Sequence, residues 1–169
     1  MEHLTEVIVR GDVLEAAGVR YACRIGRAGA TVDKREGDLK SPVGSFAMRW
    51  CYWRPDKCAQ PPATLLPLME IGPNDGWCDD PAHPLYNQPV TLPFEGRHEK
   101  LWREDDVYDL VIPLGYNDDP PHAGKGSAIF MHLMRPDGVG TEGCVALQRA
   151  DLLALLPRFS TATMVTICP

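Results

Sequence analysis

The sequence predicts a mainly β domain with one clear helix. Short runs rich in Val, Ile and Tyr recur along the chain, as is typical of strands. The 15 glycines and 16 prolines favour many turns and few long helices. Residues 149–156 have the amphipathic pattern of a helix, with leucines on one face, Asp151 in the first turn and Pro157 directly after it.

The strands are expected in segments of four to eight residues between turn residues. Residues 5–10 and 19–25 are expected to form two adjacent, paired strands, because the Gly11-Asp12 and Gly18 turn residues lie between them. Further strands are predicted at residues 45–52, 108–114, 127–133 and 163–167. Together these elements predict one sheet-based core.

Residues 54–98 differ from the rest of the chain. They hold nine of the sixteen prolines and show no regular hydrophobic period. We expect a long ordered loop region here, with short helical turns as an option. A loop of this length inside a compact domain is usually functional, for example as a lid or a wall of a site. The alternative is an insertion that only covers the core.

Length and composition limit the classes of protein to be considered. The 169 residues correspond to a single domain, residues 1–169, and 44% apolar residues favour a packed core over disorder. The net charge of −6 and the lack of a Lys/Arg cluster argue against nucleic acid as a partner. The chain shows no apolar segment long enough to span a membrane and no export signal at its N-terminus, so we expect a cytoplasmic protein, or a periplasmic one if a signal was removed.

The six cysteines do not suggest a metal centre. They stand at positions 23, 51, 58, 78, 144 and 168, with no Cys-x-x-Cys pair and no regular ligand spacing. We therefore expect no metal and no cofactor, and we expect reduced thiols rather than disulfides in a cytoplasmic chain.

The segment most informative about chemistry is residues 128–147. His132 ends an apolar strand, a glycine-rich turn follows, and Cys144 comes directly after Gly143 at the start of another apolar run. A nucleophilic thiol needs a lightly shielded sulfur and a base beside it, and Gly143 permits close approach of the backbone to a substrate carbonyl. Backbone N–H groups near Cys144 could then stabilise an oxyanion. The alternatives are a buried structural cysteine and a structural histidine.

Two motifs resemble the L,D-transpeptidase catalytic domain, known as the YkuD family. The family signature is a histidine followed after a gap by Ser/Thr-His-Gly-Cys, and Thr141, Gly143 and Cys144 match it, with His132 in the place of the upstream histidine. Residues 34–46, with Ser41-Pro42-Val-Gly44-Ser-Phe46, resemble the Asp-x-x-Thr-Pro-x-Gly-x-Phe segment of the family. The tracts at 77–81 and 116–120 resemble a short, single-domain branch.

The resemblance implies a fold and a reaction. The fold is a mixed β-sandwich with the cysteine near a strand end, here with one or two helices and a long proline-rich loop region. The reaction is acyl transfer on peptidoglycan stem peptides: Cys144 attacks the carbonyl of the third-position diamino acid and releases the terminal D-alanine. His132 would be the base, oriented by a group such as a backbone carbonyl. The resemblance also implies that carbapenem-type inhibitors acylate the thiol.

Three departures from the family pattern affect the substrate site. Glu142 replaces the histidine before Gly-Cys, the gap after His132 is short, and Ala146 stands where the family often has Asn or Arg. Other residues are therefore candidates for substrate contacts: Thr141, Arg135, Arg149, Tyr116 and Trp77. Arginine is suited to bind a carboxylate, but each arginine has the alternative of a solvated charge, and each aromatic that of a structural residue.

The favoured function is an L,D-carboxypeptidase that trims soluble muropeptides during wall recycling. A cytoplasmic enzyme would meet soluble tetrapeptides, and water would be the abundant acceptor. The first alternative is an L,D-transpeptidase that cross-links peptidoglycan in the envelope. The alternative of another class is a catalytically idle peptidoglycan-binding module, which Glu142 and Ala146 favour.

Overall fold

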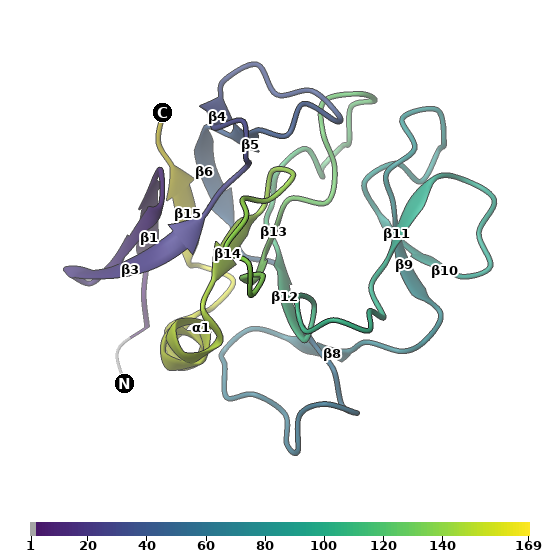
Figure 1. Cartoon of the computed structure of the whole chain (residues 1–169). Coiled ribbons are helices and arrows are strands. Elements are labelled where there is room, and N and C mark those ends of the chain that lie inside the picture. The colour runs from purple at the N-terminus through teal and green to yellow at the C-terminus, as the bar shows by residue number, and fades with distance from the viewer. Residues whose placement is uncertain (1–2) are drawn as a thin grey trace.

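The computed structural model describes residues 3–169 and confirms a mainly β fold. A mixed ten-stranded sheet forms its centre, a three-stranded sheet lies on one side of it, and the strands β1 and β15 with the C-terminus lie on the other side (Figure 1). Three neighbouring pairs of the large sheet are parallel, namely β1 with β15, β13 with β14 and β7 with β8. In spatial order its strands are β6 (Gly44–Ala47), β15 (Met164–Ile167), β1 (Glu6–Arg10), β2 (Val13–Ala16), β3 (Val19–Arg24), β14 (Val145–Leu147), β13 (Phe130–Leu133), β12 (Leu110–Pro113), β7 (Cys51–Trp53) and β8 (Leu68–Glu70).

The remaining elements are small. The three-stranded sheet has the order β10 (Pro89–Thr91), β9 (Asp75–Cys78), β11 (His98–Lys100), and β4 (Ala30–Thr31) pairs with β5 (Ser41–Pro42). The helix α1 (Arg149–Leu155) continues into the 3₁₀ turn η1 (Leu156–Arg158). Within the part of the chain that the structure describes, no helix has the length and apolar character needed to cross a membrane.

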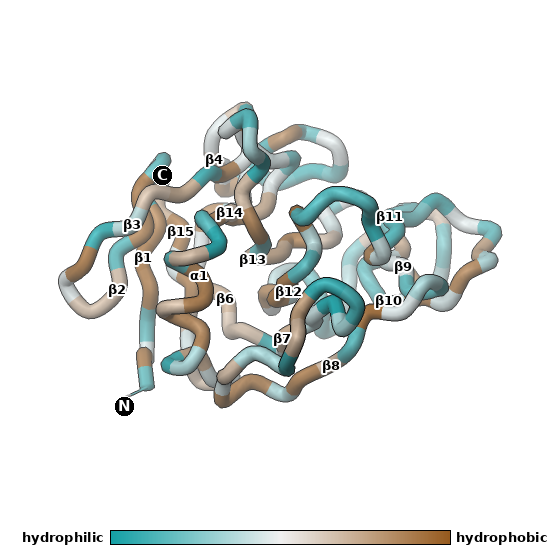
Figure 2. The backbone as a smooth tube through the Cα atoms, turned by 60° about the horizontal axis from the view of Figure 1, so that its bottom comes forward, coloured by the Kyte–Doolittle hydropathy of each residue, from teal (hydrophilic) through white to brown (hydrophobic). Residues whose placement is uncertain are grey.

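Two hydrophobic clusters cover the two faces of the central strands. In β13, Met131 and Leu133 belong to the larger cluster, into which α1 buries Leu152 and Leu155. Phe130, on the opposite face of the same strand, belongs to the second cluster. Figure 2 shows the hydrophobic backbone segments of β1, β15 and α1 on the side of the larger cluster, and hydrophilic loops near β11. The alternation of side chains along β13 is the period-2 pattern of a strand buried on both faces.

Most predicted elements are present. The segments predicted at 5–10, 108–114, 127–133 and 163–167 contain β1, β12, β13 and β15, and the predicted helix is α1 with Asp151 in its first turn. The predicted direct pairing of residues 5–10 with 19–25 is wrong, because β2 lies between β1 and β3 and pairs with both. The predicted strand at 45–52 is two strands, β6 and β7, at distant places in the sheet.

The long ordered loop region expected at residues 54–98 also contains short strands that were not predicted. This segment contains β8, β9 and β10 and reaches the first residue of β11. These strands have three or four residues each, too few to show a hydrophobic period, and their prolines lie at or outside strand ends. The three-stranded sheet is held by pairing across the chain, with Trp77 opposite both Pro89 and Glu99.

Candidate active site

The register of β13 and β14 brings His132 and Cys144 to the same face of the sheet. The two strands are parallel neighbours, and His132 pairs with Ala146. Alternate residues of a strand share a face, so His132 and Phe130 lie on the same face of the sheet. Cys144 stands two residues before Ala146 and therefore shares the face of Ala146. Phe130 and Cys144 indeed belong to one cluster, on the face opposite to Met131.

The thiol of Cys144 is buried and hydrogen-bonded. It donates to the Ala128 carbonyl at 3.2 Å, and its sulfur accepts from the Phe130 N–H at 3.3 Å. Burial raises the pKa of the Cys144 thiol to about 12, with a further contribution from the negative charge of Glu99. The expected lightly shielded sulfur is therefore not what the structure shows, since Cys144 is only 8% exposed. The resting form is a neutral thiol.

His132 is a buried, neutral imidazole at neutral pH. Its Nδ1 lies 2.8 Å from the Leu133 carbonyl oxygen, which assigns the proton to Nδ1 and leaves Nε2 as the free acceptor. Burial lowers the pKa of His132 to about 4. The imidazole and the Tyr108 ring pack in an edge-to-face arrangement, with centroids 5.4 Å apart. Among the described residues, the hydrogen bonds of the thiol run to backbone groups rather than to His132, so the thiol must rotate before it can transfer its proton.

The turn before Cys144 is fixed by side chains of both family-like motifs. Thr141 Oγ1 donates to the Cys144 carbonyl at 2.7 Å and accepts from the Gly143 N–H at 3.1 Å. Ser41 Oγ, from the other motif, donates to the Gly143 carbonyl at 2.7 Å. Gly143 has a φ of +144°, and a Cβ there would lie 2.9 Å from the Lys40 carbonyl oxygen. Only glycine fits this turn without displacing the backbone.

The carbonyl that accepts the thiol proton belongs to a residue with an uncommon conformation. Ala128 has a φ of +53°. Its N–H donates to Asn87 Oδ1 at 2.9 Å, and the same oxygen accepts from Trp77 Nε1 at 3.0 Å. Asn87 Nδ2 donates to the carbonyls of Tyr116 and Asn117 at 3.1 and 2.8 Å. One buried amide therefore joins the proline-rich segment to the backbone beside the nucleophile.

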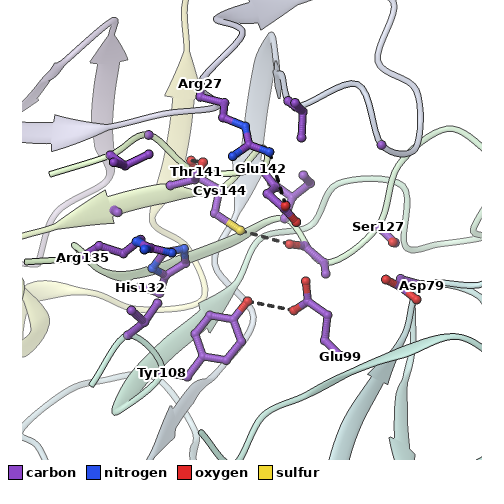
Figure 3. A pocket seen from close by; sticks show the side chains of 18 of the residues that line it. Arg27, Asp79, Glu99, Tyr108, Ser127, His132, Arg135, Thr141, Glu142 and Cys144 are labelled. Carbon is purple, nitrogen blue, oxygen red and sulfur yellow. Dashed lines mark hydrogen bonds and ion pairs between the residues drawn. The ribbon is translucent and has the colours of Figure 1, made fainter. Parts of the chain in front are cut away.

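A cavity of about 550 Å³ contains both predicted catalytic side chains (Figure 3). This volume lies in the range of small-ligand sites. Its polar lining is mixed in charge and consists of Arg27, Lys34, Glu36, Asp79, Glu99, Arg103, Tyr108, Ser127, His132, Arg135, Thr141, Glu142 and Cys144. Within residues 3–169 there is no group of three or more His, Cys, Asp or Glu side chains that could hold a metal ion.

Sequence reasoning missed Glu99 and Tyr108. Tyr108 Oη donates to Glu99 Oε2 at 2.8 Å, and Figure 3 shows both groups pointing toward the space in front of Cys144. Burial raises the pKa of Glu99 to about 7 and the pKa of Tyr108 well above its ordinary value. Neither residue lies in a motif, and no spacing in the sequence links β11 to residue 108. Asn87 was missed for the same reason.

The five candidates for substrate contact separate into two groups. Thr141 and Arg135 line the cavity, and Arg135 also forms an ion pair with Asp137 at 2.9 Å. Arg149, Tyr116 and Trp77 do not line it.

The residues outside the cavity have structural partners. Arg149 pairs with the buried Asp109. Trp77 is buried edge-on against Phe130, at 4.9 Å between centroids. Tyr116 packs edge-on against Phe46, at 5.4 Å, and donates its hydroxyl to a backbone carbonyl. These three predicted substrate contacts therefore lie outside the cavity that contains Cys144.

Glu142, at the position of the family histidine, has an exposed side chain. It lies 3.8 Å from Arg27 across the rim of the cavity, and its side chain is 76% exposed. The pairing is a surface ion pair of small energetic weight.

A thiol and an imidazole on adjacent strands, facing one cavity, form the arrangement of a cysteine-dependent acyl-transfer domain. The chain belongs to the YkuD family, because the model of the L,D-transpeptidase catalytic domain matches residues 2–167. This confirms the family predicted from the two motifs and implies L,D-transpeptidase-type acyl transfer on peptidoglycan. No match was found among curated proteins or among solved structures.

Proposed function

We propose that this protein is an L,D-carboxypeptidase that cleaves the bond between the third-position diamino acid and the terminal D-alanine of a stem peptide. The observation that carries this proposal is the presence of Cys144 and His132 in one cavity. Cys144 Sγ attacks the peptide carbonyl, and its proton passes to His132 Nε2. His132 then protonates the leaving D-alanine nitrogen, and a thioester remains on the sulfur.

The charge of the cavity supports a zwitterionic peptide as substrate. Basic and acidic side chains both line the cavity, and a stem peptide carries both carboxylates and an amine. Arg27 and Arg135 stand at the exposed rim, with side chains 51% and 56% exposed. Arginine binds carboxylates with two parallel hydrogen bonds, so these two residues are the proposed contacts for substrate carboxylates.

Water is the proposed acceptor of the acyl group. Ala146 lines the cavity with a methyl group where many family members have a larger polar side chain, so that contact for a second peptide is missing here. The test is incubation with a purified disaccharide tetrapeptide and mass spectrometry of the products. We expect tripeptide plus D-alanine with little dimer. Dimer as the main product at millimolar substrate would contradict the hydrolase.

The cytoplasm is the proposed compartment of this activity. All six cysteines are free, and free thiols are typical of a reducing compartment. Fractionation of the source cell tests this proposal, and recovery of the native protein from the periplasm would contradict it.

The second candidate function is L,D-transpeptidation, which the family match favours. It uses the same thioester and replaces water with an amine. The third is an idle peptidoglycan-binding module, which the raised pKa of Cys144 favours. Two results together would establish the module. The protein would bind the tetrapeptide without turnover, and its thiol would be no more reactive than free cysteine in the presence of ligand.

A further inference from the structure

Glu99 differs from every other carboxylate in the cavity. It extends from β11, in the small sheet, toward the face of β13 and β14 that holds Cys144 (Figure 3). Its one side-chain hydrogen bond in the described part of the chain comes from Tyr108 at 2.8 Å, and no cation lies within ion-pair distance there. The other three carboxylates each have an arginine: Glu36 and Asp79 lie 3.9 and 3.1 Å from Arg97, and Glu142 lies 3.8 Å from Arg27.

The Tyr108 contact fixes the orientation of the Glu99 carboxyl. Tyr108 packs its ring against His132 and directs its hydroxyl to Glu99 Oε2. The same tyrosine therefore holds the imidazole and the carboxyl at fixed places around the thiol. Because Oε2 is occupied, Oε1 is the oxygen free to exchange a proton with a molecule in the cavity.

We propose that Glu99 is a second acid–base residue of this site, which takes the proton of the acyl acceptor when the thioester on Cys144 is resolved. The inference rests on the proposed thioester chemistry and assigns a residue to its second half. The acceptor oxygen, or nitrogen, forms a bond to the acyl carbon while its proton passes to Glu99 Oε1. The carbon–sulfur bond then breaks with its electron pair on Cys144 Sγ. The sulfur regains a proton from the Glu99 acid, and the carboxylate is restored.

The charges around Glu99 are compatible with this division of work. A carboxylate at Glu99 opposes ionisation of the thiol, and this opposition disappears once the sulfur is acylated. The raised pKa of Glu99, about 7, allows it to gain and lose a proton near neutral pH. The titratable and charged groups facing it are Tyr108, Asp79, Glu142, Arg103 and Cys144.

The two half-reactions can be measured separately with a p-nitrophenyl ester of an N-acetylated amino acid. Acylation is followed as release of p-nitrophenolate, and deacylation as loss of the acyl mass from the isolated acyl-enzyme. The variants are Glu99→Gln, which keeps the shape and the acceptor for Tyr108, and Glu99→Ala, assayed with and without added formate. Glu95→Gln is the matched control, since it makes the same chemical change at an exposed residue of the loop before β11 that does not line the cavity.

We expect Glu99→Gln to acylate within about threefold of the wild-type rate and to deacylate about 10²-fold more slowly or worse, as for loss of a general base. Formate should restore deacylation in Glu99→Ala, and Glu95→Gln should resemble wild type in both steps. Equal losses in both steps, without rescue, would reveal a merely structural residue, and unchanged deacylation would overturn the proposal. A wild-type protein that forms no acyl-enzyme would overturn the thioester itself. Normal acylation by the p-nitrophenyl ester, together with no cleavage of tetrapeptides, would overturn only the substrate assignment.

Discussion

The side-chain oxygen of Asn87 accepts a hydrogen bond from the Ala128 N–H at 2.9 Å, and the Ala128 carbonyl accepts the hydrogen bond of the Cys144 thiol. The peptide units flanking Ala128 thus connect the amide of a buried asparagine on one side with the nucleophile on the other. Asn87 stands between β9 and β10, in the proline-rich part of the chain. The proline-rich segment therefore contributes to the placement of the nucleophile as well as to the wall of the cavity.

Asn87→Ala should destabilise the protein and slow acylation. The change leaves the Trp77 Nε1–H and the Ala128 N–H without their acceptor, and each buried unpaired group costs about 1–3 kcal/mol. Ala128 has a φ of +53°, so loss of the bond frees it to leave the left-handed region. We expect the free energy of unfolding in urea to fall by about 2–6 kcal/mol. The rate of Cys144 alkylation should fall together with the rate of acylation.

Asn74→Ala is the matched control for this variant. Asn74 is exposed in the turn before β9, so its loss should change the free energy of unfolding by less than about 0.5 kcal/mol. An Asn87→Ala protein as stable as the Asn74→Ala protein would show that the asparagine bonds carry little weight.

Cys144→Ala should abolish turnover and leave the fold intact, because a small buried residue replaces another one. We expect a carbapenem to acylate this thiol, as the resemblance of the two motifs implies. Intact-mass spectra should show one carbapenem adduct on wild type and none on the variant, with the other five cysteines unmodified. An adduct on Cys144→Ala would place the nucleophile elsewhere.

His132→Ala should lower the rate of acylation about 10²- to 10⁴-fold, the range for loss of a general base. His132 Nε2 is free because Nδ1 is held by the Leu133 carbonyl. The variant should also alkylate more slowly near pH 7, where the wild-type thiol is otherwise neutral. Rates are best compared with iodoacetamide over pH 6–10. Superimposable pH profiles of the two proteins would argue against a proton transfer between Cys144 and His132.

The sequence was sufficient for the parts of the site that a motif contains. The Gly143-Cys144 turn and His132 were predicted because they lie within one short segment of the chain that resembles the family signature. The main strands were predicted because each carries several consecutive β-branched or aromatic residues.

The residues that were missed meet the site through long-range contacts. Glu99 reaches the cavity only because β11 pairs with β9, and a strand of three residues has no detectable period. Tyr116 and Trp77 carry the same chemistry as ligand-stacking aromatics, and only packing shows that both have structural partners. Burial also raises the pKa of Cys144, and no local sequence pattern indicates this shift.

Acid should destabilise the protein through His132. Its pKa is lowered from 6.5 to about 4 by folding, so between these values the unfolded chain binds a proton that the folded chain excludes. This contribution to stability is complete above pH 6.5 and is lost as the pH falls toward 4; at 1.36 kcal/mol per pKa unit it amounts to about 3 kcal/mol. Glu99 acts in the opposite direction, because its raised pKa makes the folded state lose stability as the pH rises from 4.5 toward 7.

The difference between variant and wild type isolates the histidine from this opposing contribution. The free energy of unfolding in urea is measured from pH 4.5 to 7.5 for wild type, His132→Gln and His122→Gln, the last being an exposed histidine. Gln cannot take up a proton, so the advantage of wild type over His132→Gln should shrink by roughly 2–3 kcal/mol from pH 7.5 to 4.5. His122→Gln should follow the wild-type curve. Parallel curves for wild type and His132→Gln would mean that the imidazole is solvated and charged in the folded protein, which would contradict its burial as the neutral base beside Cys144.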